Sequence, residues 1–238
     1  MKYFIVSDIH GFYDELLEAL EKVDYDALNR NHKLIVCGDM FDRGPKSFEV
    51  YEYLKELHNN DKVIILQGNH EVFLIDYLSE QVRVAFNIER NGFFETVSSF
   101  GKEINIKMDQ SNIDSVLKYK EDINNAFPDL KEWLSNLPLY YETKMHIFVH
   151  AGLDKLSTDE TWKDSNKRTM HWESKFYDDK EFDTSSISKL IVAGHTRTHK
   201  MPSEGRVGEH GIYKSSNKVM IDGCVEKSRI INVYIFEE

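Results

Sequence analysis

Five short apolar runs in this chain each lead into a cluster of residues that can bind a metal ion, the third of them through Gln67. The runs cover residues 3–6, 34–37, 63–66, 147–149 and 190–193. The clusters that follow them are Ser7-Asp8-Ile9-His10-Gly11, Gly38-Asp39-Met40-Phe41-Asp42-Arg43-Gly44, Gly68-Asn69-His70-Glu71, His150-Ala151-Gly152-Leu153 and Gly194-His195-Thr196. Carboxylate, amide and imidazole groups repeated in this way predict a metal site.

The spacing of these groups favours two ions rather than one. Asp8 and His10 are two positions apart, so extended backbone points both side chains the same way, and together they can bind one ion. Asp39 has two oxygens and can bridge two ions. The other candidate ligands are Asn69, His150 and His195. Two divalent ions about 3.5–4 Å apart activate a water held between them and clamp the oxygens of an in-line displacement.

The ligand types also narrow the choice of metal. Mixed oxygen and nitrogen ligands suit Mn²⁺, Fe, Zn²⁺ or Ni²⁺ better than Ca²⁺. The set contains no thiolate, which argues against a closed structural zinc site. We therefore expect two divalent metal ions, with manganese as the first choice.

The apolar runs indicate the elements that must position these groups. Short continuous apolar runs are typical of strands buried on both faces, and α/β sheets bind ligands beyond the carboxyl ends of such strands. Helical spacing of apolar residues over 12–23 and 47–58 predicts a helix after each of the first two strands, the second with Ser47 as its N-cap. This alternation predicts a parallel sheet with right-handed crossovers.

The rest of the chain is expected to complete a mixed α/β fold. Residues 71–136 have helical patterning and no good strand, which predicts a helical insertion over one end of the sheet. Further strands are expected at 139–142, 146–149, 190–193, 218–221 and 229–236, with a long, partly helical polar loop over 154–188. We predict one domain over 1–238, in which two stacked mixed sheets are flanked by helices.

Composition excludes several classes of protein. The 238 residues include 30 basic and 41 acidic side chains, a net charge of −11, so we expect no stable nucleic-acid binding. The two cysteines give no disulfide framework. No apolar run exceeds four residues, and the first is broken by Asp8, so we expect neither a membrane span nor a signal peptide, and a cytoplasmic protein.

The five clusters, in this order, resemble the phosphoprotein-phosphatase branch of the calcineurin-like metallophosphoesterases. The similar members are bacterial and phage serine/threonine phosphatases and symmetrical diadenosine tetraphosphate hydrolases, and the resemblance covers residues 3–225. Two further stretches are common in the bacterial members: Asn91-Gly92 with Glu95-Thr96-Val97, and Leu137-Pro138-Leu139-Tyr140-Tyr141-Glu142.

The resemblance implies a role for each site residue. Asp8, His10 and Asp39 would hold the first metal, and Asp39, Asn69, His150 and His195 the second. A hydroxide bridging the metals would attack phosphorus directly. His70 would give a proton to the leaving oxygen, Asp42 would orient His70, and Arg43 with Asn69 would bind the phosphoryl oxygens.

Two departures from the family pattern stand out. Many calcineurin-like nucleases end their last motif in Gly-His-x-His, whereas this chain has Gly194-His195-Thr196-Arg197, which favours the phosphatase branch. The family also tends to carry a second phosphate-binding arginine in Trp-x-Arg. This chain reads Trp172-Glu173-Ser174-Lys175, which leaves Lys175, Arg168 or Arg197 as substitutes.

Three functions follow as hypotheses. The first is hydrolysis of phosphomonoesters, above all phosphoserine or phosphothreonine in proteins. The second is hydrolysis of dinucleoside tetraphosphates or other nucleotides, which needs aromatic and basic residues at the rim of the site, expected on the insertion. The third is a non-catalytic metal and phosphate binder. We expect Glu71 to be a helix-start carboxylate near positive charge, and Asp222 a turn residue.

Overall fold

The computed structural model describes residues 1–79, 83–108 and 113–238. Its first sheet has the strand order β3-β2-β1-β9. The strands are β1 (Lys2–Val6), β2 (His32–Val36), β3 (Val63–Ile65) and β9 (Tyr234–Glu237). The first three are parallel and β9 pairs antiparallel with β1, so the carboxyl ends of β1 to β3 meet at one edge.

The second sheet has the order β4-β5-β6-β8-β7. The strands are β4 (Tyr140–Glu142), β5 (His146–Val149), β6 (Leu190–Ala193), β7 (Tyr213–Ser215) and β8 (Lys218–Met220). The three central strands are parallel, while β4 and β7 close the edges as antiparallel partners. The loops after β5 and β6 therefore leave this sheet at the same end.

The two sheets pack against each other through alternate side chains of their central strands. Ile5 and Ile35 of the first sheet share a buried cluster with Phe148 and Val192 of the second. The intervening residues of β1 and β2 face the helices instead, in a separate core. Both faces of the central strands are thus buried, which explains why their sequences are continuously apolar.

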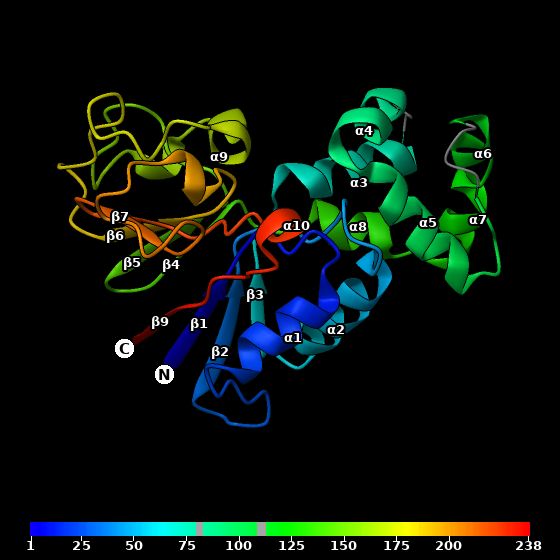
Figure 1. Ribbon diagram of the computed structural model, residues 1–238, viewed down its shortest axis with the longest axis horizontal. Helices are drawn as coiled ribbons and strands as arrows, with labels where there is room; N and C mark the ends of the chain where they lie inside the picture. The colour runs from blue at the N-terminus through cyan, green and yellow to red at the C-terminus, as the bar shows by residue number, and fades with distance from the viewer. Residues whose placement is uncertain (80–82, 109–112) are drawn as a thin grey trace.

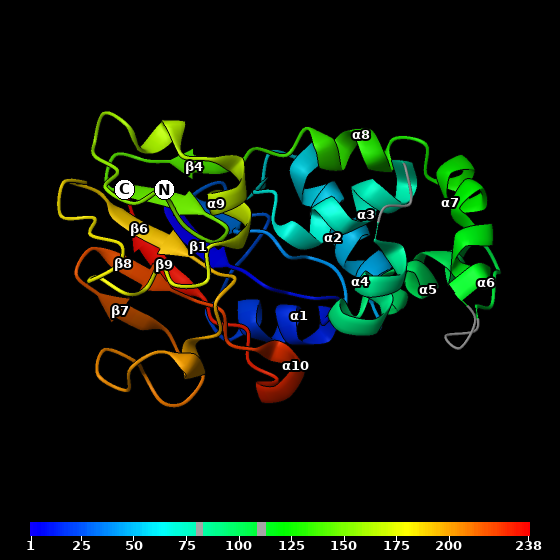
Figure 2. The ribbon, with the colours of Figure 1, turned by 90° about the horizontal axis from the view of Figure 1, so that it is seen from above.

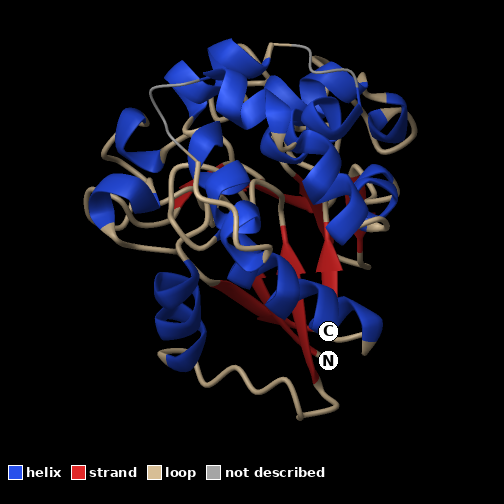
Figure 3. Cartoon of the chain, turned by 90° about the vertical axis from the view of Figure 1, so that its right-hand side faces the viewer, coloured by secondary structure: helices blue, strands red, loops and turns tan. Residues whose placement is uncertain are grey.

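Helices cover the outer face of the first sheet and extend beyond it (Figures 1 and 2). α1 (Tyr13–Glu21) and α2 (Ser47–Asn59) pack on the sheet. The following helices are α3 (Asn69–Ser79), α4 (Val84–Asn91), α5 (Phe93–Glu103), α6 (Ile113–Lys118), α7 (Lys120–Ala126) and α8 (Leu130–Ser135). Figure 3 shows most of the helices gathered at the end of the molecule away from both termini.

The outer face of the second sheet is covered largely by irregular chain. This segment contains η1 (Trp162–Asp164) and α9 (Lys167–Trp172), and the short elements η2 (Thr198–Lys200) and α10 (Val225–Ser228) follow β6 and β8. The fully buried Lys218 Nζ donates to the Phe182 carbonyl at 2.5 Å and pairs with Asp179 at 2.9 Å. It therefore fastens this segment to β8.

The mixed α/β fold with two sheets is confirmed, and several local predictions need correction. Ser47 is not the N-cap of α2: Lys46 is, and the Ser47 hydroxyl lies 3.2 Å from that of Thr96. The strand predicted from 229 begins only at Tyr234, because α10 and the left-handed Arg229 come first. Strand β7 was not predicted.

The helical segment predicted over 71–136 begins at Asn69, and residues 80–82 and 109–112 lie outside the described residues. None of the described helices is both long enough and apolar enough to cross a lipid bilayer. That all 238 residues form one domain stays a prediction.

Candidate metal centre

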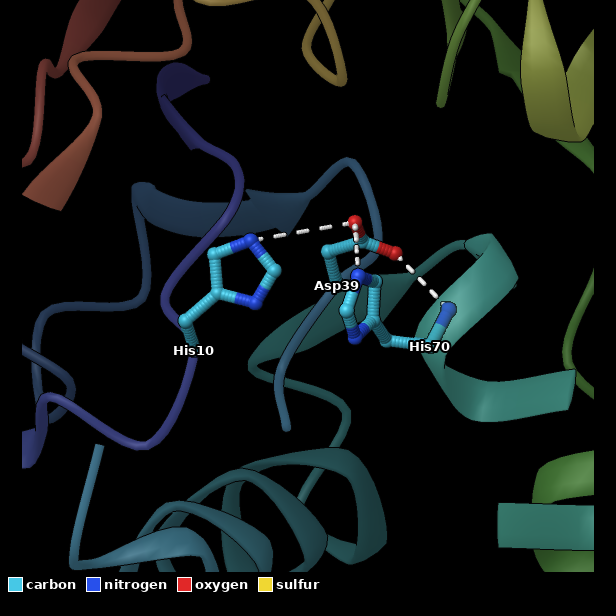
Figure 4. A group of neighbouring side chains, drawn as sticks. All are labelled: His10, Asp39 and His70. Atoms are coloured by element: carbon cyan, nitrogen blue, oxygen red, sulfur yellow. Dashed lines mark hydrogen bonds and ion pairs between the residues drawn. The ribbon is translucent and has the colours of Figure 1, made fainter. Parts of the chain in front are cut away.

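The candidate ligands meet where the carboxyl ends of strands from both sheets approach each other. In the first group, His10 Nε2 lies 3.9 Å from both Asp8 Oδ1 and Asp39 Oδ2. His70 Nε2 lies 3.7 Å from the same oxygen of Asp39. Figure 4 shows the neighbouring His10 and His70 rings, both facing the same oxygen of the Asp39 carboxylate.

The second group shares Asp39 with the first. Its other carboxylate oxygen, Oδ1, lies 3.4 Å from His150 Nε2. That nitrogen also lies 3.0 Å from Asn69 Oδ1 and 3.2 Å from His195 Nδ1. Two ligand clusters joined by one carboxylate are thus brought together from five strand ends.

Hydrogen bonds to backbone carbonyls fix the tautomers of two of the histidines. His10 Nδ1 lies 2.8 Å from the Phe41 carbonyl, and His150 Nδ1 lies 2.8 Å from that of Cys37. A carbonyl only accepts, so each Nδ1 carries the proton and each Nε2 keeps its lone pair. Those lone pairs face Asp39, which is the arrangement that a metal ligand requires.

The electrostatics of the buried groups also fit cations. Burial and the neighbouring Asp39 raise the pKa of Asp8 to about 8, and burial raises the pKa of Asp39 to about 7. Burial lowers the pKa of His10 and His195, and brings the pKa of His150 to about 4. Divalent cations stabilise the ionised form of crowded carboxylates and bind the lone pairs of neutral imidazoles. This set of side chains therefore fits two divalent cations.

Gly194 lies against one of these carboxylates. A Cβ placed on Gly194 would fall 2.2 Å from Asp8 Oδ2 and 2.5 Å from Ser7 Oγ. The same Asp8 oxygen accepts a hydrogen bond from the His195 backbone at 2.9 Å. Only glycine at this position allows the loop after β6 to close over Asp8.

His70 and Asp42 form a hydrogen-bonded pair beside the ligands. His70 Nδ1 lies 2.5 Å from Asp42 Oδ2. Thr96 of α5 supports the pair from behind: its hydroxyl donates to Asp42 Oδ1 at 2.5 Å and accepts from the Asp42 backbone at 2.8 Å. All three are buried, so the imidazole is held in one orientation, and its Nε2 faces the metal ligands.

Arg43 contacts both imidazoles of the first group. One guanidinium nitrogen touches His10 Nε2 and the other lies 3.2 Å from His70 Nε2. Because arginine only donates, both Nε2 atoms accept, and the proton of His70 lies on Nδ1, facing Asp42. A cation bound by His10 would take up the lone pair that Arg43 contacts, so the guanidinium would have to turn away.

Glu71 is a structural residue at a helix start, as expected, although its partners differ from those expected. Its carboxylate accepts from the backbone of Gly68, Asp39 and Met40 at 2.6, 2.9 and 2.8 Å. It therefore ties the loop after β2 to the start of α3 through amides rather than a cationic side chain. Burial and Asp39 raise its pKa to about 7.

Asp222 fits its expected turn role. It accepts from the Cys224 backbone at 2.7 Å. It is also buried, and burial together with the charge of Asp8 raises its pKa. Asp222 therefore belongs to the same acidic surroundings as the first ligand group.

The supporting residues Thr96 and Gly92 were not assigned roles from the sequence, although a signal was present. Both lie in the stretch that resembles bacterial family members. The Gly92 carbonyl accepts from the Arg43 backbone at 3.1 Å. Gly92 has φ +75°, and a Cβ there would lie 2.7 Å from the Arg43 nitrogen. The stretch that resembles bacterial family members therefore contains residues that contact the Asp42-Arg43 loop.

The candidates for a second phosphate-binding cation separate clearly. Lys175 is exposed and pairs with Glu181 at 3.2 Å, and Arg168 is exposed on α9. Arg197 instead lines a pocket together with Arg43 and His195. Of the three, Arg197 is the one that the fold brings beside Arg43.

The aromatic rim comes from two segments rather than from the insertion alone. Trp172 at the end of α9 is 43% exposed. Its ring lies 5.6 Å from that of Phe73 on α3 and 6.2 Å from that of His195. An accessible indole therefore stands beside the candidate ligands.

Comparison with known proteins agrees with this geometry. The family model described as calcineurin-like phosphoesterase matches residues 1–229. The symmetrical bis(5'-nucleosyl)-tetraphosphatase of Vibrio campbellii is 31% identical over 66% of this chain and 46% of its own length. The asymmetrical bis(5'-nucleosyl)-tetraphosphatase PrpE of Bacillus velezensis is 35% identical over 37% of this chain and 39% of its own.

The chain thus spans less than half the length of these relatives. Among solved structures, that of a putative diadenosine tetraphosphatase covers 99% of this chain, and the chain covers 89% of it. The TM-score is 0.58 and the identity 17%, a likeness that concerns the fold.

Proposed function

Because the chain belongs to the calcineurin-like phosphoesterases, we propose that it is a two-metal hydrolase that cleaves phosphoanhydride bonds of nucleotides such as dinucleoside tetraphosphates. The observation that carries the hydrolase part is the pair of ligand clusters joined through Asp39. Beside them stands the His70–Asp42 pair, which such a reaction needs for its leaving group.

We propose that Asp8, His10 and Asp39 hold one cation, and that Asp39, Asn69, His150 and His195 hold the other. When bound, two such cations lower the pKa of a water and neutralise charge that develops on the phosphoryl oxygens. The protein supplies the shared carboxylate and the fixed Nε2 lone pairs, so the ligands are oriented before a cation arrives.

His70 holds and moves the proton in this proposal. Asp42 accepts the Nδ1 proton, so Nε2 is the atom that can take up a second proton from solvent. The resulting imidazolium would give this proton to the departing oxygen and return to the neutral ring with its proton on Nδ1. Arg43 lies within reach of the same space and offers a planar fork that matches two phosphoryl oxygens. Arg43 comes from the loop after β2, which the buried Thr96 and Glu71 hold in place, and His70 comes from the first turn of α3.

The choice of substrate rests on the relatives and on the rim. The named relatives act on bis(5'-nucleosyl)-tetraphosphates, which favours nucleotides over the phosphoproteins that the sequence alone favours. The exposed Trp172 supports the same choice, because base stacking on an aromatic ring contributes about 1–3 kcal/mol. Phosphoprotein hydrolysis moves to second place.

The test is a substrate panel with protein stripped of metal and reloaded with one metal at a time. We expect diadenosine tetraphosphate to be cleaved with a higher kcat/KM than a phosphoserine peptide, and Mn²⁺ to be an effective metal. Trp172→Ala should raise KM for the dinucleotide about tenfold, whereas Phe86→Ala, which removes another exposed aromatic, should not. Faster cleavage of the phosphopeptide would overturn the substrate assignment, and no hydrolysis of any phosphate ester would overturn the enzyme.

A further inference from the structure

We propose that a basic pocket beside the metal centre binds the phosphates that lie beyond the scissile one, with Arg197 and Lys200 as its specificity-determining residues. This inference rests on the proposed function, since it names where the remainder of a polyphosphate chain would lie. The pocket measures about 350 Å³. It is lined by Arg43, Ser174, Tyr177, His195, Thr196, Arg197 and Lys200.

The pocket opens directly onto the candidate ligands. Two of its lining residues, Arg43 and His195, also contact the ligand clusters: Arg43 through His70 at 3.2 Å, and His195 through His150 at 3.2 Å. A phosphoryl group at the metal centre would therefore have Arg43 as a neighbour on the side of the pocket. Further phosphates of the same chain can continue into it without crossing the molecule.

The lining has the charge that a polyphosphate requires. Arg43, Arg197 and Lys200 bring three positive charges into a chain whose net charge is −11. Within the described part of the chain, no carboxylate lies at ion-pair distance from Lys200. Arginine forks and lysine point charges are the usual ligands of phosphate oxygens.

Glu226 of α10 fixes the two arginines relative to each other. One of its oxygens, Oε1, pairs with Arg197 and lies 3.7 Å from Arg43 Nη1. The other oxygen, Oε2, is buried without a hydrogen-bond partner. Glu226 compensates one of the three positive charges, so the pocket keeps a net positive charge.

Arg197 and Lys200 lie on the same loop as the candidate metal ligand His195. Arg197 directly follows Gly194-His195-Thr196, so the metal ligand and the pocket arginine share one loop. Lys200 ends the short η2 turn of the same loop. The loop that delivers His195 to the cations therefore also delivers both pocket cations, and the family's Trp-x-Arg arginine, absent here, is not needed for this purpose.

The test measures binding rather than turnover. Tripolyphosphate, as its preformed Mn²⁺ complex, and orthophosphate are titrated calorimetrically into Mn²⁺-loaded protein. We expect the wild type to bind tripolyphosphate at least about tenfold more tightly than orthophosphate. In Arg197→Gln and in Lys200→Gln this ratio should fall about tenfold, and because it compares two ligands it cancels a general loss of phosphate affinity.

Two variants separate the effect of the pocket from that of its surroundings. Arg197→Gln breaks the ion pair with Glu226 and frees Glu226 to move toward Arg43, whereas Lys200→Gln leaves the Arg197–Glu226 pair intact. A lowered affinity ratio in both variants therefore points to the pocket itself. Lys227→Gln removes the same charge from an exposed lysine beside Glu226 that does not line the pocket, and should retain the wild-type ratio. An unchanged ratio in Arg197→Gln and Lys200→Gln, an equal fall in Lys227→Gln, or no preference in the wild type overturns the proposal. A wild-type preference without dinucleotide hydrolysis would overturn the proposed substrate and leave the pocket standing.

Discussion

The substitution Thr96→Val tests whether Thr96 positions the His70–Asp42 pair, because it changes neither His70 nor Asp42. Valine has nearly the shape of threonine, so the substitution removes the hydroxyl and leaves the packing of α5. Three buried interactions disappear: the 2.5 Å hydrogen bond to Asp42 Oδ1, the 2.8 Å bond from the Asp42 backbone and the 3.2 Å contact with the Ser47 hydroxyl. A hydrogen bond to a charged group contributes about 1.5–3 kcal/mol, and an unsatisfied buried N–H costs about 1–3 kcal/mol. We expect a loss of unfolding free energy of about 3 kcal/mol.

The same change should alter catalysis in a way that stability alone does not. The Thr96 hydroxyl lowers the pKa of Asp42, against the larger effect of burial, which raises it. Losing the hydroxyl raises that pKa further, so less of Asp42 is ionised to hold His70. We expect kcat to fall about 10–100-fold and the acidic limb of the pH–kcat profile to move to higher pH. Thr96→Ser keeps the hydroxyl and should restore both.

The matched control lies one turn along the same helix. Ser99 is also buried, and its hydroxyl accepts from the Phe48 backbone at 3.0 Å without touching Asp42. Ser99→Ala should therefore cost about 1–3 kcal/mol and leave the pH profile in place. Denaturant unfolding and steady-state kinetics measure the two effects. If Thr96→Val and Ser99→Ala reduce kcat equally, with no movement of the acidic limb, Thr96 has no positioning role.

Three further predictions concern the metal centre. Asp39→Asn should abolish metal binding and turnover together, whereas His70→Asn should retain metal and lose about 10²–10⁴-fold in kcat. Metal content and kinetics measured on the same samples distinguish the two variants. Near-wild-type activity in either variant would contradict the assignment. Gly194→Ala should displace Asp8 and lower the metal stoichiometry, which elemental analysis of folded protein checks. The pKa of Asp8 is raised from 3.8 to about 8, so the folded, metal-free state binds a proton there that the unfolded state has lost, and stability falls as pH rises between these values. The melting temperature of the metal-free protein should therefore fall as pH rises through this range and recover when Mn²⁺ is added. In Asp8→Asn the melting temperature should depend less on pH.

The sequence indicated the candidate ligands because a local rule places them. A strand buried on both faces must be continuously apolar, and the first polar residues after it lie at its carboxyl end. This holds for Asp8 and His10 after β1 and for Asp39 after β2. No comparable rule gives the distance between the two sheets. The meeting of His150 with Asp39 at 3.4 Å depends on how Phe148 and Ile35 pack between the sheets.

The residues that the sequence did not assign act across long separations. Thr96 follows Asp42 by 54 positions, and its hydroxyl has no local pattern that marks it as a partner. Glu226 follows Arg197 by 29 positions and comes from a four-residue helix that periodicity cannot detect. Trp172 was noticed only as part of a motif lacking its arginine. Such contacts are tertiary, so they become visible only when α5, α9 and α10 are placed against the strand ends.

The backbone of the metal centre explains why so much of the chain must support it. Asp8, His10, Asp39, Asp42 and His195 all have positive φ, between 49° and 74°. A non-glycine residue in the left-handed region costs about 1–2 kcal/mol, and such a conformation persists only where the surroundings impose it.

The surroundings that impose this conformation come largely from the helices after β3. Glu71 of α3 holds the backbone of Asp39, and Thr96 of α5 holds that of Asp42. The segment over 69–135 therefore stabilises the strained loops that present the ligands, in addition to bordering the site. It follows that substitutions at α3 positions far from any substrate should weaken metal binding through the geometry of Asp39, whereas those at α5 positions should act on the His70–Asp42 pair through the geometry of Asp42.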